Sequence, residues 1–474
     1  MRVLLVQGFL GIDPPDSLVY PLGLSYIATA LDAAGHEVRI CDPNAQTDGL
    51  KAIARQSAAW QPDAVGISLR NIDTTDYLHY RYYYGQLAET LDAISAAAPK
   101  ATIVIGGTGF STFPERIMRD HPRIDFGVVF EGESTIIELL EKRDDPNKVS
   151  GIYVRTGDEV IFTGPRGFSP YPDIAWPKRD FCDLDPYLTT ERAIGIQSYR
   201  GCPLKCAYCN YPTLNGRRIR TRTALDVVDE IEYLHRQYGA GEVIFADSLF
   251  DLKRSFARDI CEELIKRKLG IRWSAWFETW RFDEEWFELA KRAGCYRFCF
   301  SPDGATDATM AALGKRCREA DVERVLNLAA RNPDVAFRFT LFCGTKGQDW
   351  RSVLCSIRFV VFSHFILANS RCLLSWTRLF PNAPLYAELL KEGQISYETD
   401  LLPLQVDNHR SLFHIDPGAP KLATPIMLFT WRTAEALRRL RKRLPGFSSW
   451  AARRLENWAK ERSIRLGQPE LRVL

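Results

Sequence analysis

Short apolar runs alternate with amphipathic stretches over the first 140 residues. The apolar runs have the length of strands, and the stretches between them show the 3.6-residue period of helices. The expected strands cover residues 3–6, 37–40, 64–69, 102–105 and 126–129, and the clearest helices cover 22–34, 82–97 and 114–119. This pattern predicts an α/β domain over residues 1–145, a doubly wound parallel sheet with helices on both faces.

The same alternation returns after a proline-rich stretch without periodicity, residues 146–190, which we expect to be a linker with one hairpin over 151–162. Further strands are expected at 193–197, 242–245, 272–276, 297–300, 335–342 and 373–379, with the clearest helix at 223–238. Six strand and helix units predict a partial (β/α)6 barrel of the TIM type over 191–385, whose working residues lie at the carboxyl ends of the strands. Residues 386–474 are expected to form a helical C-terminal domain.

Composition and charge narrow the class of partner. The chain has 474 residues, of which 46% are hydrophobic and 26% are charged, as in globular proteins. Its formal net charge is +3. This balance favours a small-molecule or peptide substrate and predicts neither a nucleic acid nor a membrane as partner.

The location of the protein follows from its N-terminus, its apolar stretches and its thiols. The first seven residues hold too few apolar positions for a secretory signal, and the most apolar stretch, 359–368, is too short to cross a bilayer. Twelve cysteines in such a chain are expected to be reduced thiols that serve packing, metal binding or catalysis. We therefore expect a cytoplasmic protein.

Three cysteines form the sharpest local feature. Cys202, Cys206 and Cys209 lie within eight residues, directly after an expected strand. Thiolates are soft ligands that suit zinc or iron–sulfur clusters, but a zinc site usually recruits a fourth ligand, and no histidine lies within twenty residues. Three ligands on a 4Fe-4S cluster leave one iron open to a substrate or cofactor. A zinc knuckle or three buried thiols are the alternatives.

The CxxxCxxC spacing of these cysteines resembles the motif of radical S-adenosylmethionine (SAM) enzymes. Gly201 precedes the first cysteine and Tyr208 fills the aromatic position before the last, as in that family. The resemblance implies that Cys202, Cys206 and Cys209 bind the cluster and that its open iron chelates SAM. An electron, from a donor such as flavodoxin or ferredoxin, would then cleave SAM to a 5′-deoxyadenosyl radical that abstracts hydrogen.

Later strand ends resemble the SAM-binding segments of the family. Asp247 stands where a relative's acidic residue orients the SAM amino group, although the acidic residue that often follows it is a serine here. Glu278 and Arg281 would hold the ribose and carboxylate of SAM, with solvated surface charge as the alternative. Ser301 or Asp303 would contact the ribose if the backbone follows the family's path.

Four further cysteines admit two interpretations. Cys295, Cys299, Cys317 and Cys343 could be ligands of an auxiliary cluster. Free cysteine is among the most buried residue types, so we expect these four in the core.

Small and polar residues gather after the strands of the first domain, where an open α/β sheet binds its ligand. They are Ser68, Gly106, Gly107, Thr108, Gly109, Glu131 and Gly132. Glycines allow a bulky, nucleotide-like ligand to approach the backbone closely, but tight turns use glycine as well.

Together with the cysteine motif, these loops resemble the Rossmann or flavodoxin-like cobalamin-binding domain of cobalamin-dependent radical SAM enzymes. The segment 20–24, Tyr-Pro-Leu-Gly-Leu, precedes them in the same order, and the resemblance covers about residues 1–390. It implies that the cobalamin nucleotide tail lies beside the glycine-rich loop and that the corrin faces the barrel.

One departure bears on the chemistry. No Asp-x-His-x-x-Gly motif follows the first strand, and His36 is expected to be an ordinary helix-end residue. We therefore expect the lower face of cobalt to be unligated or water-bound, shielded by Arg70 or Asn71. Weak ligation favours homolytic release of a methyl group to a substrate radical.

The basic segment 432–465 has Trp431, Trp450 and Trp458 in and beside it. A basic helix with tryptophan can bind a membrane or an anionic partner, but we favour surface helices that cap the barrel.

Three functions compete. The favoured one is a methyltransferase that methylates an unactivated carbon, or less often a phosphorus, of a small molecule or peptide. The second is a cobalamin-dependent radical SAM cyclase or rearrangement enzyme without methyl transfer. The third, a cobalamin sensor with a structural cluster, is disfavoured because a sensor needs no open iron.

Overall fold

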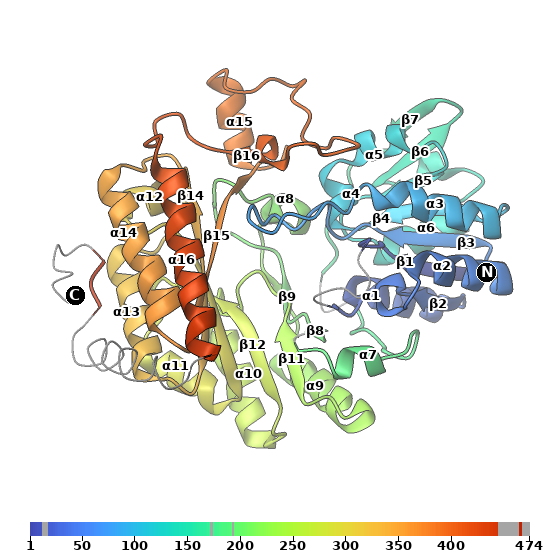
Figure 1. The fold of residues 1–474 in the computed structure, drawn as a ribbon. Helices are drawn as coiled ribbons and strands as arrows, with labels where there is room; N and C mark the ends of the chain where they lie inside the picture. The colour runs from blue at the N-terminus through green and yellow to red at the C-terminus, as the bar shows by residue number, and fades with distance from the viewer. Residues whose placement is uncertain (12–17, 171–173, 192–193, 444–463, 467–474) are drawn as a thin grey trace.

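The computed structural model describes residues 1–11, 18–170, 174–191, 194–443 and 464–466, which fold into two α/β parts side by side (Figure 1). The first part is a seven-stranded sheet in the order β2-β1-β3-β4-β5-β6-β7. Its strands are β1 (Arg2–Gln7), β2 (Glu37–Cys41), β3 (Ala64–Ser68), β4 (Thr102–Gly106), β5 (Phe126–Val128), β6 (Ile152–Thr156) and β7 (Glu159–Phe162). Strands β1 to β5 pair in parallel, so the predicted doubly wound sheet is confirmed.

Helices cover this sheet on two faces. They are α1 (Leu22–Ala33), α2 (Gly49–Trp60), α3 (Gln86–Ala97), α4 (Thr108–Thr112), α5 (Pro114–Asp120) and α6 (Glu133–Glu141). Helix α1 packs beside α6, and α2 packs beside α3. In the strand order, β2 lies on one side of β1, and β3 and the later strands lie on the other side. The direction of winding therefore switches between β1 and β3, and the ligand cleft of such a sheet opens at this switch point.

The expected hairpin over 151–162 forms as β6 and β7, and it extends the first sheet. Strand β6 pairs antiparallel with β5 through Phe126 and Val154. The alternating apolar residues of β6 are buried against the sheet, whereas those of β7 are partly exposed at its edge. Part of the stretch that we expected to be a linker therefore belongs to the N-terminal sheet.

The second part is an open seven-stranded sheet in the order β16-β15-β14-β13-β12-β11-β8. Its strands are β8 (Gly195–Ile196), β11 (Glu242–Phe245), β12 (Arg272–Phe277), β13 (Cys295–Asp303), β14 (Ala336–Cys343), β15 (Ser370–Arg378) and β16 (Phe413–His414). Neighbours from β8 to β15 pair in parallel. Within the described residues, β8 and β15 do not pair, so the six parallel strands do not close into a complete barrel. The predicted partial barrel is therefore confirmed.

Helices cover the outer face of this sheet. They are α9 (Ala224–Tyr238), α10 (Arg254–Arg267), α11 (Glu284–Arg292), α12 (Asp307–Ala312), α13 (Glu319–Arg331) and α14 (Trp350–Val360), which continues into the π-helix η4 (Val361–Ile366). Helix α9 shows why the predicted bounds were accurate. The Thr223 side chain accepts a hydrogen bond from the Asp226 amide, and Gly239 ends the helix at a φ of 71°.

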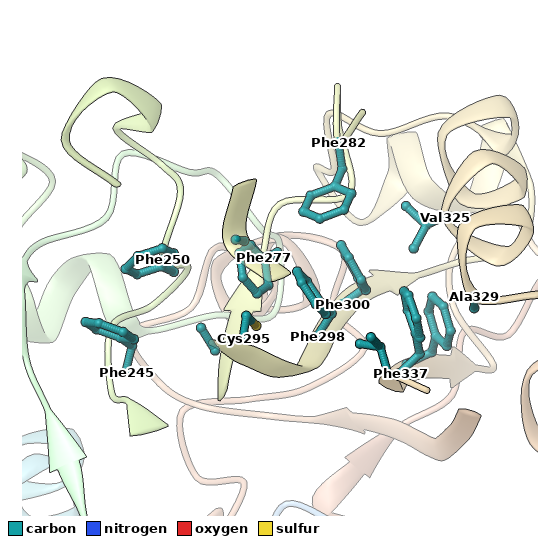
Figure 2. Packing of buried hydrophobic residues seen from close by; sticks show 14 of the residues in the cluster. Phe245, Phe250, Phe277, Phe282, Cys295, Phe298, Phe300, Val325, Ala329 and Phe337 are labelled. Atoms are coloured by element: carbon teal, nitrogen blue, oxygen red, sulfur yellow. The ribbon is translucent and has the colours of Figure 1, made fainter. Parts of the chain in front are cut away.

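Aromatic rings fill the space between this sheet and its helices (Figure 2). Phe298, Phe300 and Phe337 stack with interplanar angles of 13° to 22°. Cys295, Cys317 and Cys343 lie in the same hydrophobic core, as predicted. All twelve cysteines lie in the described residues, and none forms a disulfide.

The C-terminal region joins the barrel. Strand β16 pairs antiparallel with β15, and the long helix α16 (Ala423–Arg443) packs against α14 and η4. Trp431 on α16 donates a hydrogen bond from Nε1 to the Cys372 carbonyl at 3.0 Å. This contact agrees with a capping helix, whereas Trp450 and Trp458 lie outside the described residues. No helix in the described ranges is long and apolar enough to span a membrane.

Candidate active site

A cavity of about 1610 Å³ lies between the two sheets. Its lining includes Ser68 and Gly107 at the carboxyl ends of β3 and β4, and Trp276 and Arg338 on the opposing face of the barrel sheet. Pockets for drug-sized ligands measure roughly 300 to 1000 Å³, so this cavity has room for a larger ligand or for two ligands.

The expected ligand-binding residues of the first domain all line this cavity: Ser68, Gly106, Gly107, Thr108, Gly109, Glu131 and Gly132. The glycines of the loop serve its own packing, however. Gly107 has a φ of 97°, and a Cβ there would come within 2.7 Å of the Leu69 carbonyl; one at Gly109 would come within 2.8 Å of it. The open backbone position is Gly23, which lines the cavity and whose added Cβ would meet no atom within 4 Å.

Glu131 holds the two parts of the molecule together. Its carboxylate accepts two hydrogen bonds from Arg220, at 2.6 and 2.9 Å. The neighbouring Glu133 accepts one from Arg200 at 2.6 Å. Both arginines come from the two-stranded β9 (Tyr199–Arg200) and β10 (Arg220–Thr221), which flank the cysteine loop. Glu131 therefore lines the cavity while its oxygens bind arginine.

Cations and histidines also line the first domain's side of the cavity. Arg70 and Asn71 lie there, and the surrounding protein lowers the pKa of the Arg70 guanidinium by desolvation. His36 does not line the cavity, but His79 does. The His79 ring lies 3.4 Å from Asp76 and packs edge-on against Trp431. The sequence argument missed His79 because it considered only the loop after the first strand.

The cysteine loop begins at a tight backbone approach. Gly201 has a φ of 95°, and a Cβ there would come within 2.1 Å of the Arg218 carbonyl. The Cys202 amide donates to the Gly216 carbonyl at 2.9 Å, and the Cys209 amide donates to the Cys206 carbonyl at 3.2 Å. Glycine is thus required where the loop leaves β9, and the backbone folds the three thiols into one short loop.

The three thiols are close enough to influence one another. Burial, together with negative charge on Cys206 and Cys202, raises the pKa of Cys209 to about 12. Burial also raises the pKa of Cys206, whereas the Lys315 ammonium lowers it. Bound metal would shift such thiols to thiolate. No carboxylate shares the loop, so this donor set suits a soft metal cluster.

In the described part of the chain, no three His, Cys, Asp or Glu side chains converge closely enough to hold a single metal ion. Each thiolate of a four-iron cluster binds its own iron, so the ligands of a cluster need not converge in that way. Cys206 and Cys209 also line a second cavity of about 240 Å³ beside α15 (Pro384–Lys391).

Tyr208 ties the cysteine loop to the barrel sheet. Its hydroxyl donates to Asp303, which lies at the end of β13 with a φ of 59°. The Lys315 ammonium lies 2.5 Å from the same carboxylate, and the Thr340 hydroxyl also donates to it. Sequence reasoning did not find Lys315 or Thr340, because only the fold brings them to Asp303.

Asp247 follows β11 and lines the large cavity. Its carboxylate accepts from the Ser198 amide at 2.9 Å, from the Ser198 hydroxyl at 2.6 Å and from the Tyr199 amide at 3.3 Å. Burial raises the pKa of Asp247 to about 7, although these hydrogen bonds lower it. Asp247 therefore anchors the turn that leads into the cysteine loop.

The other expected SAM contacts lie outside the lining of the large cavity. The Glu278 carboxylate binds Arg316 at 2.8 Å, and Arg281 stacks its guanidinium over Trp280 at 4.2 Å. Ser301 is half-buried on β13, two residues before Asp303. The structure thus brings Asp247 to the cavity and does not bring Glu278, Arg281 or Ser301 there.

Two family profiles match the chain. The B12 binding domain matches residues 12–140, and the radical SAM superfamily matches residues 196–359. The chain therefore contains a segment that matches a B12-binding domain, followed by a segment that matches a radical SAM domain. Both resemblances expected from the sequence are confirmed.

Relatives of this chain are named for different activities. An uncharacterized methyltransferase of Pyrococcus horikoshii is 29% identical over 300 residues, which cover 62% of this chain and 63% of that protein. The anaerobic magnesium-protoporphyrin IX monomethyl ester cyclase of a Synechocystis strain is 28% identical over 339 residues, covering 69% of this chain and 66% of the cyclase. The chain thus spans less than two thirds of each relative's length.

The fold also matches a solved structure of a radical SAM methyltransferase, TsrM of Kitasatospora setae, with tryptophan and a SAM analogue bound. The TM-score is 0.75 at 23% identity, over 91% of this chain and 88% of the other. At this identity the likeness establishes the fold.

Proposed function

We propose that the protein is a methyltransferase of this superfamily, which methylates an unactivated carbon of a small molecule or peptide with a 4Fe-4S cluster, SAM and cobalamin as cofactors. One observation carries the proposal. Asn210 and Tyr211, which directly follow Cys209, line the same cavity as the loop at Gly107. Two cofactors and a substrate can therefore share one cavity. When bound, the cluster and SAM supply hydrogen abstraction, and cobalamin supplies the methyl group.

The proposed roles follow the placement of the residues. Residues 1–145 bind cobalamin, the part of 146–190 outside the hairpin β6–β7 links the two parts, 191–385 bind the cluster and SAM, and 386–474 cap the barrel. Cobalamin lies against the cavity wall that includes Gly106 to Gly109 and Gly132, with Arg70 or Asn71 near its lower face. Cys202, Cys206 and Cys209 hold the cluster as thiolates.

SAM lies beside Asp247, which positions the cysteine loop through Ser198 and Tyr199. Glu278, Arg281 and Ser301 remain proposed SAM contacts, and SAM would have to replace Arg316 at Glu278 and Trp280 at Arg281. Tyr208 and Asp303 connect the cluster loop to the strand that carries Ser301.

An electron donor of the flavodoxin or ferredoxin type would reach the cluster from outside. The small cavity beside α15 is lined by Cys206 and Cys209 and also by Lys205 and Arg217. Two cations beside the cluster ligands suit an acidic donor in a reducing cytoplasm.

A cyclase or rearrangement enzyme is the second candidate, because one relative of the same architecture is named a cyclase. Product mass separates the two, since methyl transfer adds one CH2.

Cofactor loading is the first test. Anaerobic reconstitution should yield about four iron and four sulfide per chain, together with bound cobalamin. Cys206→Ala should lose the iron, whereas Cys295→Ala, which changes a core thiol, should keep it. Full iron in a variant with all three loop cysteines replaced would contradict the ligand assignment.

Turnover is the second test. Each methylated product should come with one deoxyadenosine and one S-adenosylhomocysteine, and deuterium from the target carbon should enter deoxyadenosine. Methylated product without deoxyadenosine would contradict the radical route, and deoxyadenosine with unmethylated product would favour the cyclase.

A further inference from the structure

One part of the large cavity is strongly basic. It lies at the amino ends of β13 to β15 and at α16. The charged lining there comprises the guanidinium groups of Arg297, Arg338, Arg371, Arg438 and Arg439 and the carboxylates of Glu191 and Glu435. Five positive and two negative groups leave a net charge of +3 at this end. Neither the proposed cofactor sites nor the cysteine loop uses these residues.

Strand register sets two of these arginines side by side. Arg338 on β14 and Arg371 on β15 are direct partners in the parallel ladder. Partners on adjacent strands lie about 5 Å apart and point to the same face of the sheet. On β14 the other face is the aromatic core, because Phe337 and Phe339 are buried there. Both arginines therefore lie on the face away from that core and line the cavity, where Arg371 is exposed to solvent.

The carboxylates at this end are already engaged. Glu191 pairs with Arg297. Glu435 binds Arg438 at 2.9 Å and Arg439 at 2.6 Å, and it lies 3.0 Å from Nε2 of His364. His364 adds little charge, because burial lowers its pKa to about 4.

Arg371 stands apart from its neighbours. Its guanidinium makes no ion pair or hydrogen bond with any part of the chain that the structure describes. Its side chain is exposed to solvent in the cavity, and partial desolvation together with the nearby Arg438 charge lowers its pKa. A group so placed gains free energy from any anion that enters the cavity.

We propose that this end of the cavity binds an anionic oxygen group of the substrate, a carboxylate or a phosphate, through Arg371 and its neighbours. Guanidinium groups bind such groups with two parallel hydrogen bonds. The inference rests on the proposed function and names its substrate class: small molecules with the methyl-accepting carbon at one end and an anionic group at the other.

The strands set the length of such a substrate. Arg338 lies five residues before Cys343, the last residue of β14. At about 3.3 Å per residue, the anionic group would lie on the order of 15 Å from the carboxyl edge of the sheet, where the cofactors are proposed.

The test uses octyl phosphate as a probe, with octanoate as the carboxylate match, 1-octanol as the neutral match and octylamine as the cationic match. Each is titrated calorimetrically into the reconstituted full chain at low salt. Octyl phosphate or octanoate should bind more tightly than 1-octanol, octylamine should bind least, and added salt should weaken the anions. The tighter of the two anions identifies the natural headgroup.

Variants locate the site. Arg371→Gln should weaken binding of the anion about tenfold and leave 1-octanol unchanged. Arg371→Lys keeps the positive charge but lacks the two parallel hydrogen-bond donors of a guanidinium group. Its affinity for the anion should lie between those of the wild type and Arg371→Gln. The matched control is Arg331→Gln, an exposed arginine on α13 that faces Glu284 at 3.5 Å and does not line the cavity. It should bind like the wild type.

Two outcomes would overturn the inference: anions that bind no better than 1-octanol, or equal anion affinity in the wild type and Arg371→Gln. Bound cobalamin and iron are measured in the same preparation. A wild type that holds both cofactors but shows no preference for anions would leave the proposed function standing. Preference for anions without cofactors would instead count against the proposed function.

Discussion

Replacing Asp247 tests whether this residue positions the cysteine loop or only contacts SAM. Its carboxylate accepts three hydrogen bonds, two from the backbone amides of Ser198 and Tyr199 and one from the Ser198 hydroxyl. Each is worth about 1 kcal/mol net, so Asp247→Ala should weaken the turn before the cysteines by about 3 kcal/mol. Because 1.4 kcal/mol is a tenfold change, the loop should open about 100-fold more often.

The assay is the rate at which an anaerobic iron chelator removes iron from the reconstituted protein. Asp247→Ala should lose iron about 100-fold faster than the wild type. Asp247→Asn should lose it at nearly the wild-type rate, because its amide oxygen still accepts from both backbone amides and the Ser198 hydroxyl can turn to accept from the amide nitrogen.

Asp251 provides a matched control. It is equally buried, burial likewise raises its pKa to about 7, and it accepts from the Glu278 amide and the Trp286 indole. Asp251→Ala should destabilise the barrel without speeding iron loss. If Asp247→Ala kept its iron as long as the wild type while losing SAM affinity, Asp247 would act only as a SAM contact.

The same anchor predicts a pH dependence. The folded-state pKa of Asp247, about 7, lies above its ordinary value near 4. A group of this kind contributes most stability below its unfolded pKa, and the contribution is lost as the pH rises through about 7. Relative to Asp247→Asn, the wild type should therefore lose iron faster at pH 8 than at pH 5.5, and a constant ratio would contradict the raised pKa.

Two further predictions concern the cavity and the contact between the two parts. Gly23→Leu should abolish cobalamin binding, measured by absorbance after gel filtration. Gly23 lines the cavity and an added Cβ meets no protein atom within 4 Å, so the leucine side chain would occupy space that cobalamin needs. Gly241→Leu, at an equally open position outside the cavity, should bind cobalamin normally. Asp73→Ala should destabilise the protein by about 3 to 5 kcal/mol, measured by thermal unfolding, because it leaves the buried Arg378 without its carboxylate at 2.9 Å. Asp63→Ala, which removes one exposed hydrogen bond, should cost less than 1 kcal/mol. Normal cobalamin binding in Gly23→Leu, or equal stability of the two aspartate variants, would refute the respective argument.

The sequence by itself determined the features that depend on residues close in the chain. The spacing of Cys202, Cys206 and Cys209 is a local pattern, and the structure places all three in one loop. Apolar runs predicted the parallel strands of both sheets. In the first sheet the reason is that a strand between two helix layers must be apolar along its length. The bounds of α9 followed from its cap at Thr223 and its terminating Gly239.

The tertiary structure decided what those local patterns mean. Gly107 was expected to make room for a ligand, but its backbone packs on Leu69, and Gly23 is the open position. The hairpin at 151–162 carried a strand pattern, yet only its pairing with β5 assigned it to the first sheet.

The basic end of the cavity shows most clearly why the sequence was insufficient. Arg338 and Arg371 are 33 residues apart in the chain and become neighbours through the register between β14 and β15. Register depends on how whole faces of side chains pack, and a shift of β15 by one residue would turn Arg371 toward the aromatic core. Local pattern can therefore predict which elements form, whereas packing over the whole molecule decides which side chains share a site.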